Sequence, residues 1–545
     1  MKKRKCTSKD VEYLENQQTN RWITSGAITV GIELGSTQIK TVAVGPNYQP
    51  LASGVYKWEN QYRDGYWTYD LDDVWIGIQE SYRLMAEQIK QQYGRTLRKI
   101  NALGISGMMH GYLAFNEADE LLVPFRTWRN NYANFASRLL SYQFQVNVPE
   151  RWSIALFEQA IMNKEPHAHH VAKLMTLAGY VHWQLTGEHV SGIGDASGMF
   201  PIDTEKQYYR ADLMDRYDRL LVEEGYEQKI ETMLPHILKA GDCAGTLTEA
   251  GAKRIDPSGC LEAGIPLCPP EGDAATGMVA TNSIQPRTGN VSVGTSIFSM
   301  FVLDAPMSRP HPEVDIVSTP DGYDVAMIHA NNGTSDLDAW MHLFEEVLTT
   351  MGVSVESSTL YERLFATLSK ADANAGGLLN YNYVSSEFIT DVKQGTPTFL
   401  RHRDSQFNLA NFMKSHIYSS FVTLKMGVAR LAEAEDLAFD CITAHGGLFQ
   451  SPTVAYDLAA ALDVPVQVRS TAHRGGAWGI ALLASYMSET NKTSLSHFLD
   501  YNVFRNTKVE KVEPTEAHIK AFNDYALQFQ KGLRGQREAY KLFEQ

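Results

Sequence analysis

The chain of 545 residues is too long for one hydrophobic core, so two large domains or more are expected. Hydrophobic residues make up 44% and charged residues 21% of the chain, which is typical of globular proteins and excludes a disordered or fibrous one. The formal net charge of −14, with no basic stripe to offset it, argues against nucleic acid as the main partner.

The N-terminus and the cysteines favour a cytoplasmic protein. Met1–Lys5 is basic, but residues 6–20 are polar and acidic, so the apolar segment of a secretory signal is missing. No run of about 18 apolar residues occurs, so we expect no membrane span and no membrane partner. The 5 cysteines are scattered without a Cys-x-x-Cys pair, as in proteins with reduced thiols. Residues 1–26 are predicted to be a polar extension with little to bury.

Two short strands are predicted at Ala27–Leu34 and Ile39–Val44, because apolar and polar residues alternate in both. The turn between them contains three small residues, Gly35, Ser36 and Thr37, and Lys40 follows. Its N–H groups and hydroxyls can face an anion, with Glu33 at its mouth for a hydrated metal ion. The alternative is an ordinary hairpin, since short glycine turns match by chance.

The next segments predict a helix, a strand and a loop. Residues 73–93 have helical spacing, and residues 100–106 form a buried strand that ends in a glycine-containing loop. In this loop Met109 and His110 project from a strand end, where α/β proteins usually bind ligands. A histidine of this kind is more often a satisfied core residue. Residues 153–185 are predicted to be largely helical, with a helix stop at Thr186-Gly187.

Asp273 lies in the loop Pro269–Gly277, just before a helix of small residues. One interpretation is an N-cap, which is common and contributes about 1 kcal/mol. The other is a carboxylate held near a substrate hydroxyl, as phosphotransferases require.

A domain boundary is predicted near residues 282–287, because a second strand there again ends in Gly-Thr-Ser at residues 294–296. The rest of the chain continues the alternation of strands and helices that characterises the α/β class. Helices are predicted at 409–434, at 475–486, where small residues suit close packing, and over the last 35 residues; a strand is predicted at 464–468. The glycine loop 446–451 could accept a nucleotide base or could be a plain turn.

Two further clusters have simpler interpretations. His167, His169 and His170 lack acidic or cysteine partners at ligand spacing, so a solvated helical face is favoured over a metal site. The aromatic residues between 62 and 75 could stack on a sugar or pack in the core. They are Tyr62, Tyr66, Trp67, Tyr69 and Trp75.

Taken together and in order, these motifs resemble those of the FGGY carbohydrate kinases. The matching segments are Glu33–Lys40, Gly104–Gly111, Leu185–Glu188, Asp195–Gly198, Gly272–Ala275, Gly294–Ser296 and Gly446–Ser451. The resemblance runs from about residue 27 to about residue 540, and the Met-His-Gly sugar loop is most similar to the xylulokinase subgroup. It implies two actin-like (ribonuclease H-like) domains with an active-site cleft between them.

The resemblance also implies a division of labour along the chain. Residues 27–284 would bind the sugar through Met109, His110, Trp128 and Asp273, with Asp273 as general base. Residues 285–545 would form the nucleotide-binding domain. The implied ATP ligands are Gly35, Ser36, Thr37, Lys40, Gly294, Thr295, Ser296, Gly446, Gly447, Gln450 and Ser451, with Glu33 toward Mg²⁺.

Several positions depart from the family pattern, mostly on the sugar side. Glu33 stands where the family usually has Asp, and Ala274 replaces the Asn that commonly follows the catalytic Asp. Residues 128–131 are Trp-Arg-Asn-Asn instead of Trp-Asn-Asp, and residues 385–390 only partly match Gly-Glu-Arg-x-Pro.

The sequence therefore predicts an ATP-dependent kinase of a small ketose, such as xylulose or another pentulose, or of a polyol. ATP, Mg²⁺ and the sugar are the expected ligands, and a homodimer is left open. Two alternatives remain: a non-enzymatic actin-like nucleotide switch, and a catalytically weakened sugar sensor. The switch needs neither a sugar loop nor a base at Asp273, whereas the altered sugar side leaves the sensor open.

Overall fold

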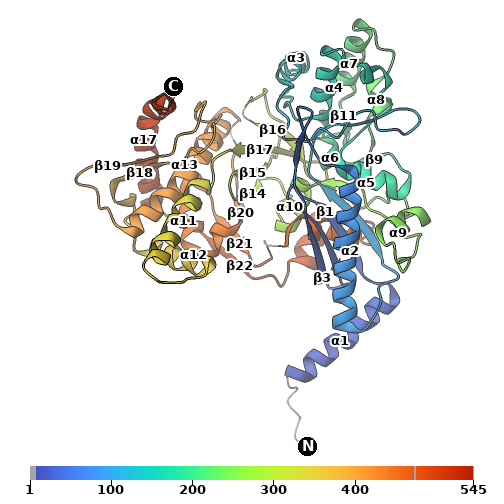
Figure 1. The fold of residues 1–545 in the computed structure, drawn as a ribbon, viewed down its shortest axis with the longest axis horizontal. Coiled ribbons are helices and arrows are strands. Elements are labelled where there is room, and N and C mark those ends of the chain that lie inside the picture. The colour runs from blue at the N-terminus through green and yellow to red at the C-terminus, as the bar shows by residue number, and fades with distance from the viewer. Residues whose placement is uncertain (1–7, 313, 436, 472–473, 544–545) are drawn as a thin grey trace, which may run out of the picture. The chain divides into compact units, whose positions relative to one another are not determined.

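The computed structural model describes residues 8–312, 314–435, 437–471 and 474–543, and the chain forms two compact units (Figure 1). Unit 1 consists of Met1–Ile284, Ile316–Asp324 and Arg474–Asn506. Unit 2 consists of Gln285–Asp315, Val325–His473 and Thr507–Gln545. The chain thus passes from unit 1 to unit 2 after Ile284 and later returns twice to unit 1.

Unit 1 is built on a five-stranded sheet with the order β13-β6-β1-β2-β3. Its strands are β1 (Thr29–Leu34), β2 (Gln38–Val44), β3 (Pro50–Lys57), β6 (Ala102–Gly107) and β13 (Glu271–Gly272). The first three strands form an antiparallel meander, and β6 and β13 then add in parallel beside β1. The strands predicted from the alternating pattern are therefore present.

Helices α2 (Leu71–Tyr93) and α15 (Gly475–Tyr486) pack on this sheet. Asp70 caps α2 by accepting from Asp72 N, and Gly94 ends it with a positive φ, so local sequence fixes both ends. α15 lies so close to β1 that a side chain at Gly31 would come within 2.1 Å of Ala477 O. The close packing predicted for residues 475–486 is confirmed.

The remainder of unit 1 includes a second hydrophobic core, rich in residues of α4 and α7, and helices α5 and α9, which belong to the core of the five-stranded sheet. Its helical elements are α3 (Asn134–Phe144), α4 (Ser153–Met162), η1 (Pro166–His170), α5 (Leu177–Thr186), α6 (Ile193–Ala196), α7 (Ala211–Glu223), α8 (Ile230–Met233), α9 (Glu249–Ile255), α10 (Asp273–Thr281), α16 (Leu495–His497) and η6 (Phe498–Val503). Its short strands are β4 (Gln61–Arg63), β5 (Tyr66–Thr68), β7 (Leu113–Phe115), β8 (Lys173–Met175), β9 (Val190–Gly192), β10 (Ile202–Asp203), β11 (Tyr208–Tyr209) and β12 (His236–Leu238).

The structure adds detail to two predictions for unit 1. The prediction that residues 153–185 are largely helical, with a stop at Thr186-Gly187, is confirmed, although Pro166 opens a separate 3₁₀ turn and β8 intervenes between α4 and α5. The polar extension is not without structure, since Ser8–Ser25 form helix α1. Ile23 near its end is only 3% exposed and Trp22 packs against the same core. The few apolar residues in the sequence of α1 give no sustained helical period.

Unit 2 contains a series of paired strands in the order β17-β15-β14-β20-β21-β22. These strands are β14 (Thr288–Val293), β15 (Ile297–Val302), β17 (Asp324–Ala330), β20 (Cys441–His445), β21 (Val466–Arg469) and β22 (Val509–Val512). The short strand β16 (Asp315–Ser318) begins where the chain passes from unit 2 to unit 1. β14, β15 and β17 are antiparallel, whereas β20 and β21 add in parallel beside β14. Unit 2 thus repeats the strand plan of unit 1.

The longest helix of unit 2, α13 (Leu409–Glu435), is buried along most of its first half, and its predicted span is confirmed. The other helical elements are α11 (Ser335–Thr350), α12 (Ser357–Ala366), η2 (Thr367–Lys370), η3 (Ala375–Gly377), η4 (Gly447–Gln450), α14 (Pro452–Leu462), α17 (Glu516–Ala539) and η7 (Tyr540–Leu542). A hairpin of β18 (Leu378–Tyr381) and β19 (Thr398–Arg401) packs against α13 and α17. None of the described helices has the length and apolarity that a membrane crossing requires.

Candidate active site

Three parallel strands of unit 1 end together and deliver the predicted site residues to one edge of the sheet. Leu34 of β1 pairs with Gly107 of β6, and Gly107 pairs with Gly272 of β13. Gly35 and Asp273 are the residues that immediately follow two of these strand ends. The carboxyl ends of parallel strands are where α/β folds place their ligands.

All three carbonyl oxygens of the first turn, Gly35 to Thr37, accept hydrogen bonds from other parts of unit 1. Trp58 Nε1 donates to Gly35 O at 2.7 Å, and Tyr69 OH donates to Ser36 O at 2.6 Å. Trp58 N donates to Thr37 O at 3.2 Å. Ser36 and Thr37 are exposed. The turn therefore leaves N–H groups and hydroxyls on its open side, as an anion-binding loop does.

Asp273 is the first residue of α10, and Gly272 occupies the N-cap position that the sequence interpretation considered for Asp273. Its Oδ1 accepts Met109 N–H at 3.3 Å and Ala274 N–H at 2.9 Å. Burial, and secondly the carboxylate of Glu33, raise the pKa of Asp273 to about 6. A carboxylate with this pKa can exchange a proton near neutral pH.

Glu33 and Lys40 pair across β1 and β2, and both contact the start of α15. Glu33 Oε2 accepts Ala477 N–H at 3.0 Å, which places a carboxylate at the positive end of the helix dipole. Lys40 Nζ donates to Arg474 O at 3.0 Å. Burial raises the pKa of Glu33.

The predicted sugar-loop residues follow β6. Met109 is buried and is joined to Asp273 through its N–H group. His110 is buried with a φ of 67°, and one of its ring nitrogens lies 3.2 Å from Gly198 O. Burial lowers the pKa of His110 to about 3, so its ring is neutral. Trp128 is half-buried and packs against the core.

The structure brings together two buried residues, Asp195 and Glu271, whose contact the sequence motifs did not indicate. Glu271 accepts the N–H groups of Asp195 at 2.9 Å and of Gly194 at 3.4 Å. Asp195 accepts Thr176 Oγ1–H at 2.5 Å. Burial, together with neighbouring carboxylates, raises the pKa of Asp195 to about 7 and that of Glu271 to about 8. Asp195 lies in the motif Asp195–Gly198 and Glu271 in the loop Pro269–Gly277, but only the tertiary structure brings them together.

The aromatic cluster divides into two groups. Tyr69 and Trp75 are buried in the core, as the packing interpretation expects. Tyr62 is 63% exposed and, with Trp67, lines a cavity of about 410 Å³. The remaining cavity residues are Gly65, Asn130, Asn131 and Tyr132.

In the described part of the chain, no group of three or more His, Cys, Asp or Glu side chains is arranged to hold a metal ion. His167 of the predicted solvated face instead bonds to Tyr112 OH at 2.8 Å. Mg²⁺ usually needs only one or two protein carboxylates, because waters and substrate phosphates complete its shell. Glu33, whose charge already raises the pKa of Asp273, suits such a hard cation.

Unit 2 has a matching second turn, Gly294 to Ser296, and again all three carbonyls are bound. Thr334 N donates to Gly294 O and Gly333 N donates to Thr295 O, both at 2.8 Å. Gly294 N closes the turn on Ser296 O at 2.9 Å. Gly294 and Thr295 are exposed.

The loop 446–451 begins beside this turn, because β20 runs parallel to β14 and Ser292 pairs with His445. Gly446 has a φ of 113°, and a side chain there would come within 2.4 Å of Val293 O, so glycine is required. Gly447 and Gln450 begin and end the 3₁₀ turn η4. Ser451 is the residue before α14.

Two family models match the chain in succession. Residues 28–280 match the N-terminal domain and residues 289–488 the C-terminal domain of the FGGY family of carbohydrate kinases. Together they cover most of the chain.

Individual relatives are distant in sequence but similar in fold. The chain is 21% identical to the xylulose kinase of Escherichia coli (strain K12) over 297 residues, which span 52% of this chain and 56% of that enzyme. Xylulose kinase from Lactobacillus acidophilus is 16% identical with a TM-score of 0.76, covering 95% of this chain and all of the other. Plasmodium falciparum glycerol kinase with ADP gives 12% identity, a TM-score of 0.73 and coverages of 93% and 98%. The predicted α/β class with two domains is confirmed.

Proposed function

Because the chain belongs to the FGGY family of carbohydrate kinases, we propose that it transfers the γ-phosphoryl group of ATP to a hydroxyl group of a small ketose or polyol. We favour a pentulose as the acceptor, since the E. coli and L. acidophilus relatives are named for xylulose. The Met-His-Gly loop of this chain supports the same choice.

The observation that carries the proposal is the position of Asp273. It begins α10 at the edge where β1, β6 and β13 end, and its carboxylate meets the backbone of the predicted sugar loop at Met109. The pKa of about 6 suits a general base near neutral pH. A residue that served only as a helix cap would need neither the contact with Met109 nor a raised pKa.

In the proposed reaction Asp273 accepts the proton of the attacking hydroxyl. The hydroxyl oxygen bonds to the γ-phosphorus while the bond to the bridging oxygen breaks and ADP leaves. Since the transition state of such transfers is loose, positioning and charge neutralisation contribute more than the strength of the base.

We propose that each of the two glycine turns binds phosphate oxygens of ATP, the first through Ser36 and Thr37 and the second through Thr295 and Ser296. Loop 446–451 would bind the adenosine. Glu33 would hold Mg²⁺ through water, and this ion supplies neutralisation of phosphate charge when bound. Lys40, bonded to Arg474 O, would act as a fixed positive charge beside the first turn.

On the sugar side, Met109, neutral His110 and Trp128 would contact the acceptor. Neutral His110 can donate a hydrogen bond from one ring nitrogen and accept one at the other. Ala274 removes an amide that the family commonly supplies, so the set of acceptor hydroxyls recognised should differ from that of the family's usual members. We assign the sugar to residues 27–284 and the adenosine to residues 285–545.

The test is ADP release from the full chain with ATP and Mg²⁺ against a panel of ketopentoses, ketohexoses and polyols. We expect at least one compound to raise ADP release well above the rate without sugar, with a phosphorylated sugar as product. Sugar binding without turnover would instead identify a sensor. Nucleotide-dependent assembly with no response to any sugar would favour the actin-like switch.

A further inference from the structure

Residues 331–334 form a loop that is hydrogen-bonded both to the second turn and to buried residues of unit 2. It joins β17 to α11, and its Gly333 and Thr334 donate the two N–H bonds that hold Thr295 O and Gly294 O. A side chain at Gly333 would come within 2.2 Å of Gly294 O. The turn therefore cannot shift unless this loop shifts with it.

The carbonyl side of the same loop is held by Asn382. Its Nδ2 donates to Gly333 O at 2.9 Å and to Asn332 O at 3.0 Å. Two backbone carbonyls facing one side chain require a donor, which fixes the orientation of the amide. Ser420 Oγ also donates to Gly333 O, at 2.9 Å.

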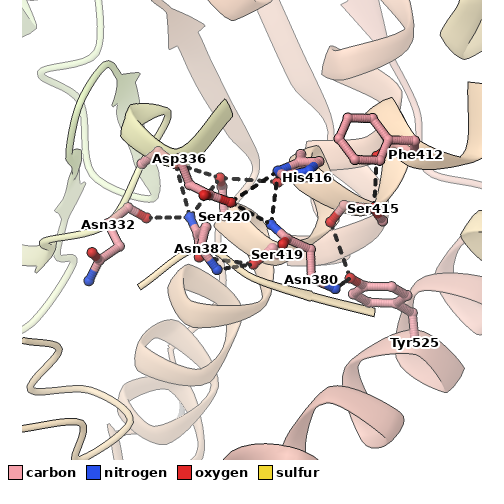
Figure 2. A network of polar contacts seen from close by, with 11 residues as sticks. Asn332, Asp336, Asn380, Asn382, Phe412, Ser415, His416, Ser419, Ser420 and Tyr525 are labelled. Atoms are coloured by element: carbon pink, nitrogen blue, oxygen red, sulfur yellow. Dashed lines mark hydrogen bonds and ion pairs between the residues drawn. The ribbon is translucent and has the colours of Figure 1, made fainter. Parts of the chain in front are cut away.

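Asn382 is itself fixed by α13, as Figure 2 shows. Its Oδ1 accepts Ser419 Oγ–H at 2.9 Å, and its backbone N–H donates to the same hydroxyl oxygen at 3.1 Å. Asn382 is 2% exposed and Ser419 is fully buried. Bonds in such a dry environment are strong, and leaving their partners unpaired is costly.

A second group in the same network provides a natural control. Asn380, two residues earlier, donates through Nδ2 to Asp336 Oδ2 at 3.2 Å and lies 2.9 Å from His416 Nδ1 (Figure 2). It is as buried as Asn382 but bonds to the first turn of α11 instead of the carbonyls of Asn332 and Gly333.

We propose that Asn382 is a positioning residue for nucleotide binding: through Asn332 and Gly333 it fixes the second turn in the shape that receives phosphate. The proposal rests on the proposed function in that the turn is taken to bind ATP. The series of contacts runs from α13 through Asn382 and Gly333 to Thr295, and every link is a hydrogen bond between described residues.

The test compares Asn382→Ala with Asn380→Ala in the full chain. Both remove a buried amide and both should lower the melting temperature. Only Asn382→Ala should raise the KM for ATP, by at least fivefold, while the KM for the best sugar stays within twofold. Hydrogen exchange of a peptide covering residues 289–302 should become faster in Asn382→Ala and remain as in the wild type in Asn380→Ala.

Equal effects of the two variants on ATP KM and on exchange would overturn the proposal. If Asn382→Ala does not fold, Ser420→Ala is the substitute, because it removes one donor to Gly333 O and leaves only a small cavity. We expect it to raise the KM for ATP and the exchange rate of residues 289–302 by less than Asn382→Ala would. No change in either quantity in Ser420→Ala would also overturn the proposal. A wild type that phosphorylates no sugar would refute the proposed function, but the exchange comparison would still decide the role of Asn382.

Discussion

The two units build the same hairpin turn and surround it with different chemistry. The first turn is held by Trp58 and Tyr69, and it lies at the same edge of the sheet as Asp273, whose carboxyl has a raised pKa. The second turn is backed by Gly333, held in turn by the neutral amide of Asn382. One strand plan therefore places the first turn near a candidate base and the second turn against a loop that is held by the amide of Asn382 and by the buried carboxylate of Glu387, which accepts Asn331 N–H at 2.8 Å.

This difference separates two tasks that a phosphotransferase must perform. Ionisable groups can move protons, but their state changes with pH, whereas amides and serine hydroxyls hold a fixed shape at any physiological pH. We therefore expect unit 1 to set the pH dependence of turnover and unit 2 to set the affinity for nucleotide.

The largest effect is expected from Asp273→Asn. Asparagine keeps the shape but cannot accept the hydroxyl proton, and general bases typically contribute about 10²–10⁴-fold. Turnover should therefore fall at least about a hundredfold, while the Kd for ATP stays nearly unchanged. ADP release, ATP binding and melting temperature should be measured on the same preparation. Near wild-type turnover in a folded variant would exclude Asp273 as the base.

Titration of Asp273 should change activity and its own contribution to stability in opposite directions. Burial and Glu33 raise the pKa of Asp273 to about 6, so turnover should fall about tenfold for each pH unit below that value. The folded chain then binds more protons than the unfolded chain above the usual aspartate pKa. The contribution of Asp273 to the free energy of unfolding should consequently be lost as pH rises through about 4 to 6.

Asp195 and Glu271 extend this stability window, because their pKa values are raised to about 7 and about 8. Below about pH 6.5 the buried neutral histidines, such as His110 with its pKa lowered to about 3, oppose this trend. Melting temperatures measured between about pH 7 and pH 8 should therefore keep falling after turnover has levelled off. Stability that rises with pH between about pH 7 and pH 8 would contradict the assignment of buried, partly protonated carboxyls.

Substitution of a glycine by alanine tests whether the shape of the second turn depends on the loop 331–334. Gly333→Ala would force a Cβ atom to 2.2 Å from Gly294 O, whereas at Gly35 the nearest atom, Gln38 O, is 3.2 Å away. Overpacking of this kind typically costs about 1–3 kcal/mol, so Gly333→Ala should raise the KM for ATP by about tenfold. Gly35→Ala should change it less. A larger rise in the KM for ATP from Gly35→Ala than from Gly333→Ala would show that the loop 331–334 does not define the shape of the second turn.

The smallest effect is expected from Tyr69→Phe. It removes one donor to Ser36 O and should cost about 1 kcal/mol of stability and raise the KM for ATP about two- to threefold. Tyr82→Phe is the matched control, since in the described part of the chain the buried Tyr82 hydroxyl bonds to no partner. Equal melting temperatures of the two variants would mean that the hydroxyl of Tyr69 does not support the turn.

Local sequence was sufficient for the strands, the two turns and the position of Asp273 at the start of a helix. These features depend on residues within one hairpin or one loop, where period-2 alternation and glycine spacing are direct physical signals. The helix 475–486 was predicted for the same reason.

Features that depend on distant partners could not be predicted in this way. Asn332 and Asn382 are 50 residues apart, and neither has a neighbour that announces a shared bond. The carboxylate of Glu271 accepts the backbone N–H of Asp195 only because α6 packs beside β13. Helix α1 was missed because only Trp22 and Ile23 supply apolar surface at its end.

The discontinuity of unit 1 has a consequence for how the chain matures during synthesis. Glu33 and its partner Ala477 are separated by 444 positions, and α15 covers β1 and β6. At a translation rate of about 5–20 residues per second, the face of β1 waits roughly 20–90 s for its covering helix. Throughout that time an apolar strand surface is open to chaperones or to other nascent chains. A fragment ending at Ile284 would keep that surface open permanently, so the unit can be completed only by a chain that is almost finished.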